Sequence, residues 1–321
     1  MMKHTEPKNL TEAILFFSKP ENCLGYLVER RWPNGVVCPT CGSEKVSFLE
    51  NQSRWQCNNR HPKRQFSIKT GTIFEGSPLG LDKWLTCIWL VTNCKNGISS
   101  HEIARDIGVT QKTAWFMLHR IRLAHQEKHE GPMGGAGSEV ETDETFIGGK
   151  ARNMHKARRE RVITGTGGKD KTVVMGLVER GGDVRAFVMD SRKKKGLQRQ
   201  VREHVAAGSA IFSDELKSYD GLAADYQHAV INHAIAYVDG RVHTNTMENF
   251  WSLLKRTLHG TYVSVEPFHL FRYIDEQAFR YNHRSDLDDS DRFDLAVRNI
   301  IGKRLTYAEL TGKVYETRTL H

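Results

Sequence analysis

Three acidic residues constrain the fold of this chain most strongly, because each lies where a short apolar segment ends or a helix begins. They are Asp143, Asp214 and Glu248. Lys255 follows Glu248 by two helical turns, so the two side chains share one face of a helix. A fold that brings these groups together would supply the ligands that two Mg²⁺ (or Mn²⁺) ions need for phosphodiester chemistry.

Composition favours a folded protein that meets nucleic acid. The chain has 321 residues, 39% of them hydrophobic, which is enough for two or three small domains with their own cores. The formal net charge is +9 and the basic residues are clustered, so a polyanion is the expected partner. A soluble enzyme with an incidentally high pI is the alternative.

Other features indicate the compartment. No stretch approaches the roughly 18–20 continuous apolar residues of a membrane span, and the N-terminus has no secretory pattern. We therefore expect no membrane partner and a cytoplasmic setting. The six cysteines should then be free or metal-bound rather than paired in disulfides.

The cysteines predict a zinc ribbon with one irregular corner. Cys38 and Cys41 have the spacing of a metal knuckle, and Cys57 begins a second one. The usual partner at position 60 is replaced by Arg60, but His61 follows directly and makes a Cys₃His site. Buried cysteines without a metal are the alternative.

Residues 97–121 fit a helix-turn-helix. Ser99 or Ser100 would cap its first helix, Gly108 would allow the turn and Thr110 would cap the second helix. An ordinary helical hairpin is the alternative. The side chains expected to meet a major groove are Gln111, Lys112 and Thr113.

Residues 148–171 are rich in basic residues and glycine. They predict a loop or hairpin that holds the phosphate backbone of DNA, although a solvated run of surface charge is the alternative. The residues expected to contact DNA here are Lys150, Arg152, Arg158 and Arg159.

The remaining pattern predicts a ribonuclease-H-like domain with a mixed five-stranded sheet. We expect strands at 140–147, 171–179, 184–189, 209–213 and 229–232, and helices at 191–206 and 246–258. In that arrangement Asp143 on the first strand lies beside Asp214 at the end of the fourth, and a helix brings Glu248 to them.

The chain is thus predicted to be a multidomain α+β protein. Its expected parts are an N-terminal helical segment (1–35), the zinc ribbon (36–75), the helix-turn-helix region (78–130), a small-residue linker (131–138), the catalytic domain (139–284) and a C-terminal tail (285–321). Within the tail, the acidic residues 285–291 are expected to form a solvated loop.

The chain resembles bacterial insertion-sequence transposases of the DDE class with an N-terminal zinc ribbon, the ISXO2-like transposase family. The resemblance runs from Cys38 to Arg284. It is carried most specifically by residues 65–74, 143–150, 213–219 and 243–256. It implies that Asp143, Asp214 and Glu248 bind the catalytic metals and that Lys255 contacts DNA near the scissile phosphate. It also implies that His243 and Asn245 line the same site.

The expected function is binding of the terminal inverted repeats of an insertion sequence, followed by metal-dependent cleavage and strand transfer into double-stranded target DNA. A homodimer or larger assembly is expected, since both DNA ends must be processed together. The protein is expected to be bacterial and associated with the nucleoid. Two rivals stay open. One is a structure-selective nuclease or resolvase on the same fold, and the other is a non-catalytic zinc-containing DNA-binding regulator.

Overall fold

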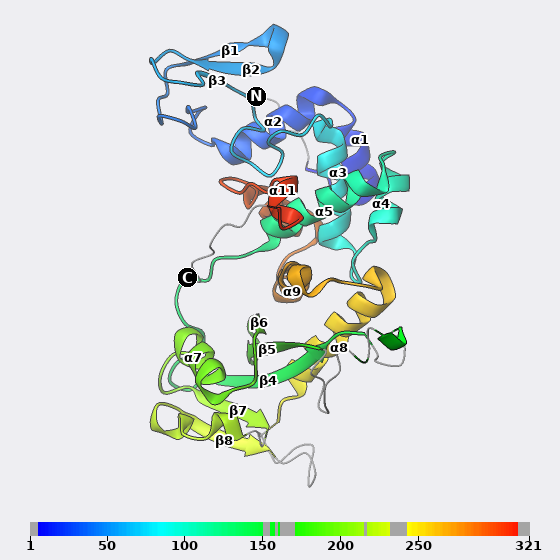
Figure 1. The fold of residues 1–321 in the computed structure, drawn as a ribbon. Coiled ribbons are helices and arrows are strands. Elements are labelled where there is room, and N and C mark those ends of the chain that lie inside the picture. The colour runs from blue at the N-terminus through cyan, green and yellow to red at the C-terminus, as the bar shows by residue number, and fades with distance from the viewer. Residues whose placement is uncertain are drawn as a thin grey trace. The chain divides into compact units, whose positions relative to one another are not determined.

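The structure, a computed structural model, describes residues 6–149, 155–157, 160, 171–214, 217–231 and 243–313. The chain forms two units, and the first combines segments from opposite ends of the sequence. It consists of the residues up to Glu127 together with those from Ser285 onward, whereas the second unit runs from Lys128 to Arg284 (Figure 1).

The first unit is built around α3, which is buried on almost every side because α1, α2, α5 and α10 all pack against it. Among the described residues, no helix of either unit is long and apolar enough to span a membrane. The helices of this unit are α1 (Leu10–Phe17), α2 (Pro20–Arg31), α3 (Leu81–Asn93), α4 (Ser100–Asp106), α5 (Gln111–His125), α10 (Asp289–Arg298) and α11 (Tyr307–Leu310).

Helix α10 brings the C-terminal segment back to the N-terminal helices. The side chain of Asp288 accepts a hydrogen bond from the backbone of Asp291, whose own side chain bonds back to form a capping box. Phe293 then packs its ring between Phe17, Tyr26 and Trp89. The prediction of a solvated loop over 285–291 is therefore wrong in its second half, because these aspartates start a helix.

A small three-stranded antiparallel sheet carries the cysteine residues. Its strands are β1 (Val46–Leu49), β2 (Arg54–Cys57) and β3 (Gln65–Phe66), in the order β1-β2-β3. The ring of Trp55 stacks on Phe66 and meets Trp32 edge-on. These few aromatic contacts are a small core for an independent sheet, which is the usual reason for a structural metal.

The second unit contains the predicted mixed five-stranded sheet, in the order β6-β5-β4-β7-β8 (Figure 1). Strand β4 pairs antiparallel with β5, which pairs antiparallel with β6, whereas β4 pairs parallel with β7, which pairs parallel with β8. The strands are β4 (Glu139–Ile147), β5 (Thr172–Glu179), β6 (Val184–Met189), β7 (Ala210–Asp214) and β8 (Gln227–Ile231).

Helices cover both faces of this sheet, and alternation along the strands decides which residue meets which helix. On one face Val174 and Val178 pack with α8 (Asn245–Thr257) and α9 (Leu270–Asn282). On the other, Met175 and Leu177 pack with α7 (Lys194–His204). Shorter elements complete the unit: η3 (Lys217–Tyr219), η4 (Leu222–Ala224), the π-helical turn η5 (Leu258–Tyr262) and η6 (Pro267–His269).

Gly176 sets how closely α8 approaches the sheet. It lies in β5 directly opposite Asp143 of β4. A Cβ atom at this position would lie 2.4 Å from Cε of Met247 and 2.8 Å from Cζ2 of Trp251. Both distances are shorter than van der Waals contact, so α8 reaches its place only because residue 176 has no side chain.

We predict that Gly176→Ala lowers the free energy of unfolding by about 1–3 kcal/mol, since the added methyl group must displace Met247 and the rigid Trp251 ring. Denaturant unfolding measures the change. Gly260→Ala is the control, because a Cβ there meets nothing within 4 Å. Equal stability of the two variants would show that α8 tolerates a shift away from the sheet.

Candidate active site and candidate metal centre

Asp143 and Asp214 lie on neighbouring parallel strands. Glu141 of β4 pairs with Phe212 of β7. Asp143 and Asp214 each lie two residues beyond this pair, on β4 and β7 respectively. The Arg180 guanidinium lies over the Phe212 ring and forms an ion pair with Glu141. Because side chains alternate along a strand, both aspartates point to the same face of the sheet as these groups, which is the face covered by α8.

The carboxylate of Asp143 is held from two sides. The backbone N–H of Glu144 donates to Oδ1 at 2.8 Å, and the indole N–H of Trp251 donates to Oδ2 at 3.0 Å. Burial, followed by the negative charge of Asp214 and, more weakly, that of Glu248, raises the pKa of Asp143 to about 6. The charges of Asp214 and Glu248 therefore act on Asp143, although among the described residues the three carboxylates do not form a group whose ligand atoms are close enough to hold a metal ion.

Helix α8 supplies Glu248 in its first turn, with the side chain exposed. Lys255 lies two turns further along the same helix and is partly exposed. Residues two turns apart lie on the same face of a helix, so Glu248 and Lys255 share one face of α8. An anion bound beside Glu248 would therefore lie on the helix face that also carries Lys255. Asn245 is the exposed first residue of α8.

Glu141 fixes the start of α8 and was not predicted as a site residue. Its fully buried carboxylate accepts hydrogen bonds from the backbone N–H groups of Thr246 and Met247, at 2.8 and 3.0 Å, and from the Thr246 hydroxyl at 2.9 Å. These are the first N–H groups of the helix, which have no partner within it. A negative charge also suits the positive end of the helix dipole.

Arg180 and His243 complete this anchor. Arg180 forms ion pairs with Glu141 and Glu139, at 2.7 and 2.9 Å, and donates to the backbone oxygen of His243 at 2.9 Å. Nδ1 of His243 lies 3.2 Å from the Glu141 carboxylate. His243 therefore contacts Glu141 and Arg180, the groups that anchor the start of α8.

The sequence did contain a signal for Glu141. It lies two residues before Asp143 on the same strand, so both side chains must share a face. A carboxylate within a buried strand needs partners, and the nearest unpaired donors on that face are the N-terminal amides of the helix that carries Glu248.

A further carboxylate, Glu144, points to the opposite face. The hydroxyl of Tyr219 donates to it, and Thr142 contacts the same hydroxyl at 3.1 Å. Burial raises the pKa of Glu144 to about 7, with Asp214 and Asp143 contributing in the same direction. Glu144 was also not predicted as a site residue. Asp143 and Glu144 are adjacent on one strand, and the sequence alone does not reveal which of the two faces α8.

The predicted DNA-reading residues begin α5. Thr110 accepts a hydrogen bond from the backbone of Thr113, and Ser99 caps α4 in the same way, as expected. Gln111 and Lys112 are exposed and Thr113 is partly exposed. The other four predicted contacts, Lys150, Arg152, Arg158 and Arg159, lie outside the described residues.

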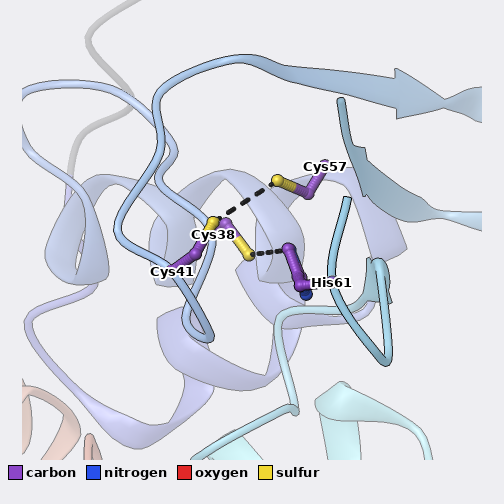
Figure 2. A group of neighbouring side chains, drawn as sticks. All are labelled: Cys38, Cys41, Cys57 and His61. Atoms are coloured by element: carbon purple, nitrogen blue, oxygen red, sulfur yellow. Dashed lines mark hydrogen bonds between the residues drawn. The ribbon is translucent and has the colours of Figure 1, made fainter. Parts of the chain in front are cut away.

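The four predicted zinc ligands converge on one point in the first unit (Figure 2). Their ligand atoms all lie within 4.8 Å of one another. Sγ of Cys38 is 3.4 Å from Nε2 of His61, and Sγ of Cys41 is 3.6 Å from Sγ of Cys57. Bonds of about 2.3 Å in a tetrahedron separate the ligand atoms by a little under 4 Å, so the set fits Zn²⁺.

Two local contacts prepare this set for a metal. Nδ1 of His61 donates to the backbone oxygen of Pro62 at 2.6 Å, which leaves the Nε2 lone pair free for a ligand bond. Burial opposes ionisation of Cys38, but hydrogen bonds from the backbone N–H groups of Cys41 and Thr40 outweigh it and lower the pKa of the thiol to about 7. His61 thus occupies the corner that Arg60 leaves open.

Comparisons with known proteins identify the family. The profile of the ISXO2-like transposase domain matches residues 134–282, and that of the transposase zinc-ribbon domain matches residues 19–59. Together these segments cover more than half of the chain. The chain belongs to the ISXO2-like transposase family. The zinc-ribbon match ends before His61, so the fourth ligand of this transposase rests on the geometry above.

A relative supports the same grouping. This transposase is 29% identical over 259 residues to a Halobacterium salinarum protein described as an uncharacterized protein in transposable element ISH50. The aligned region covers 75% of this chain and 84% of that protein. The predicted resemblance to insertion-sequence transposases is therefore confirmed.

We predict that Glu141→Ala destabilises the second unit by about 2–4 kcal/mol, because the first amides of α8 and Arg180 lose a buried acceptor. Amide hydrogen exchange should become faster at Thr246 and Met247, which reports local opening of α8. Glu203→Ala, on the exposed side of α7, is the control. Unchanged exchange at both amides would contradict the anchor.

We predict that His61→Ala purifies without stoichiometric zinc, whereas His61→Cys retains it, because a fourth thiolate restores the tetrahedral set. Metal analysis of the purified protein and thermal unfolding with and without a chelator measure the effect. His101→Ala is the control, since this histidine is exposed and distant in sequence from the cluster. Full zinc retention by His61→Ala would remove His61 from the ligand set.

Proposed function

We propose that this transposase binds the terminal inverted repeats of its insertion sequence, cleaves DNA strands there and joins them to target DNA, as a DDE enzyme with Asp143, Asp214 and Glu248 as the catalytic carboxylates. The observation that carries the proposal is geometric: Asp143 and Asp214 lie on the neighbouring parallel strands β4 and β7, and Glu248 lies in the first turn of α8, the helix that packs on the same face of the sheet. Membership of the transposase family gives the class of reaction.

The sheet order supports a ribonuclease-H-like assignment for the catalytic domain. In this topology three antiparallel strands are followed by a helix and by parallel strands on the other side of the first strand. The order β6-β5-β4-β7-β8, with α7 between β6 and β7, matches that description. Neighbouring parallel strands then carry the two aspartates, and the helix that follows the sheet carries Glu248.

The carboxylates would hold two Mg²⁺ or Mn²⁺ ions, which when bound supply charge stabilisation to the attacking and leaving oxygens of a phosphodiester. The protein's own contribution is positioning. Glu144 N–H and Trp251 fix the orientation of the Asp143 carboxylate, and Glu141 fixes the start of α8, the helix that carries Glu248. Lys255, two turns further along α8 than Glu248, would bind the phosphate that flanks the scissile bond.

DNA recognition is assigned to the first unit. Helices α4 and α5 have the capped ends and the short connection of a helix-turn-helix, with Gln111, Lys112 and Thr113 at the start of the second helix. The zinc ribbon and the basic residues around Arg158 would add phosphate contacts. Paired processing of two DNA ends calls for a homodimer or larger assembly on DNA, in a nucleoid-associated protein.

The decisive test is a cleavage and strand-joining assay on DNA that carries the ends of the element. We predict metal-dependent joined products with the intact protein. Asp143→Asn, Asp214→Asn and Glu248→Gln should each reduce them at least about 100-fold, the scale on which loss of one electrostatic group slows a reaction. DNA binding by the three variants should be retained, because the residues proposed to read the DNA ends, Gln111, Lys112 and Thr113, lie in the first unit.

Matched controls are Asp183→Asn, in the exposed turn between β5 and β6, and Glu203→Gln on α7. Both should keep full activity. Binding of the ends by the intact protein without any metal-dependent chemistry would refute the catalytic proposal and favour a DNA-binding regulator. Cleavage without joining would favour a nuclease.

A further inference from the structure

A cavity of about 300 Å³ lies in the first unit beside the first turns of α5. One face of that helix forms a wall, through residues spaced four apart: Lys112, Phe116 and Arg120. Trp84 of α3 and Tyr307 of α11 form the facing walls. The cavity therefore combines aromatic surfaces with two cations, and it adjoins the residues proposed to read DNA.

The aromatic walls are fixed in place. The Phe116 and Tyr307 rings meet edge-on with centroids 5.7 Å apart. The indole N–H of Trp84 donates to the Ser77 hydroxyl at 3.1 Å, so its polar atom is satisfied and its ring contributes apolar surface. The loop that holds Ser77 is itself tied by Lys69, which donates to the backbone oxygen of Ser77 at 3.0 Å and to that of Leu79 at 2.5 Å.

The two cations lack acidic partners at hydrogen-bonding distance within the described part of the chain. Arg120 is 6% exposed, its Nε donates to the backbone oxygen of Leu305, and its guanidinium lies 4.3 Å from the Phe116 ring centroid. Its two Nη groups donate no hydrogen bond to any described residue. Lys112 Nζ lies 5.0 Å from the Tyr307 ring centroid. Because Lys112 and Arg120 both line the cavity, an anionic group bound there would meet two cations.

We propose that this cavity binds one unpaired nucleotide of DNA, with its base against Tyr307 and Phe116 and its phosphate at Lys112 and Arg120. This inference rests on the proposed DNA-binding function and adds a site to it. Base stacking on aromatic side chains and phosphate binding by Lys and Arg are the two interactions by which proteins hold unpaired nucleotides.

A cavity of this size favours an unpaired base over a base pair. A duplex presents only the edges of its bases in a groove, whereas the flat rings of Phe116 and Tyr307 offer stacking surface to a base that has left the helix. Lys112 and Thr113 line the cavity and also begin α5. If α5 docked in the major groove of DNA, the cavity would lie close to the DNA strand beside that groove.

The test measures binding of duplexes that contain one 2-aminopurine, either extrahelical or paired, to the Asp214→Asn protein without added divalent cation, so that no strand is cut. The expected result is about tenfold tighter binding of the extrahelical form, with quenched 2-aminopurine emission. A tenfold preference corresponds to about 1.4 kcal/mol, within the range for one stacked base. Tyr307→Ala and Lys112→Ala should abolish the preference, whereas Tyr307→Phe should keep it, as should Lys95→Ala, a change at an exposed lysine that does not line the cavity.

Competition with deoxyadenosine monophosphate distinguishes binding of a free nucleotide from binding of a nucleotide that is part of DNA. Displacement of the extrahelical duplex by the free nucleotide would show that the nucleotide alone suffices, and no displacement would show that the flanking DNA is also held. Equal affinity for both duplexes, or a preference that survives Tyr307→Ala, would overturn the proposal. Because no cleavage is measured, this outcome is independent of whether the carboxylates are catalytic.

Discussion

The buried carboxylate of Glu141 is the contact on which the arrangement of the second unit depends. It links β4, the central strand, to the start of α8, and Arg180 neutralises its charge. Because Asp143 lies two residues further along β4 and Glu248 lies in the first turn of α8, one anchor sets the spacing between two of the three proposed catalytic groups. A buried ion pair of this kind contributes little net stability, but it specifies geometry.

Close approach of α8 to the sheet has a second condition, the absence of a side chain at Gly176. Trp251 reaches Asp143 only because its ring lies over that glycine. Burial of the Asp143 carboxylate beneath this helix, followed by the nearby charge of Asp214, raises the pKa of Asp143 to about 6. A buried carboxylate beside a second acidic group is the kind of environment in which the proposed divalent cation would be stabilised.

The first unit combines the small core of the zinc ribbon with a helical core around α3, and its elements come from both ends of the chain. The zinc ribbon has a few stacked rings and four metal-binding side chains, and α3 is covered partly by α10 from the C-terminal segment. The same return of the chain supplies Tyr307, a wall of the cavity beside α5. The DNA recognition proposed for this unit would therefore depend on residues that follow the proposed catalytic region in the sequence.

Local chemistry let the sequence determine much of this protein. The zinc ligands, including His61 beside Arg60, follow from spacing, the caps at Ser99 and Thr110 follow from residue type, and the strands that carry Asp143 and Asp214 follow from apolar patterning. Tertiary structure alone decided the partner of Glu141, the role of Gly176 and the return of α10. These depend on contacts between segments distant in sequence, and periodicity within one segment carries no information about which other segment will pack against it.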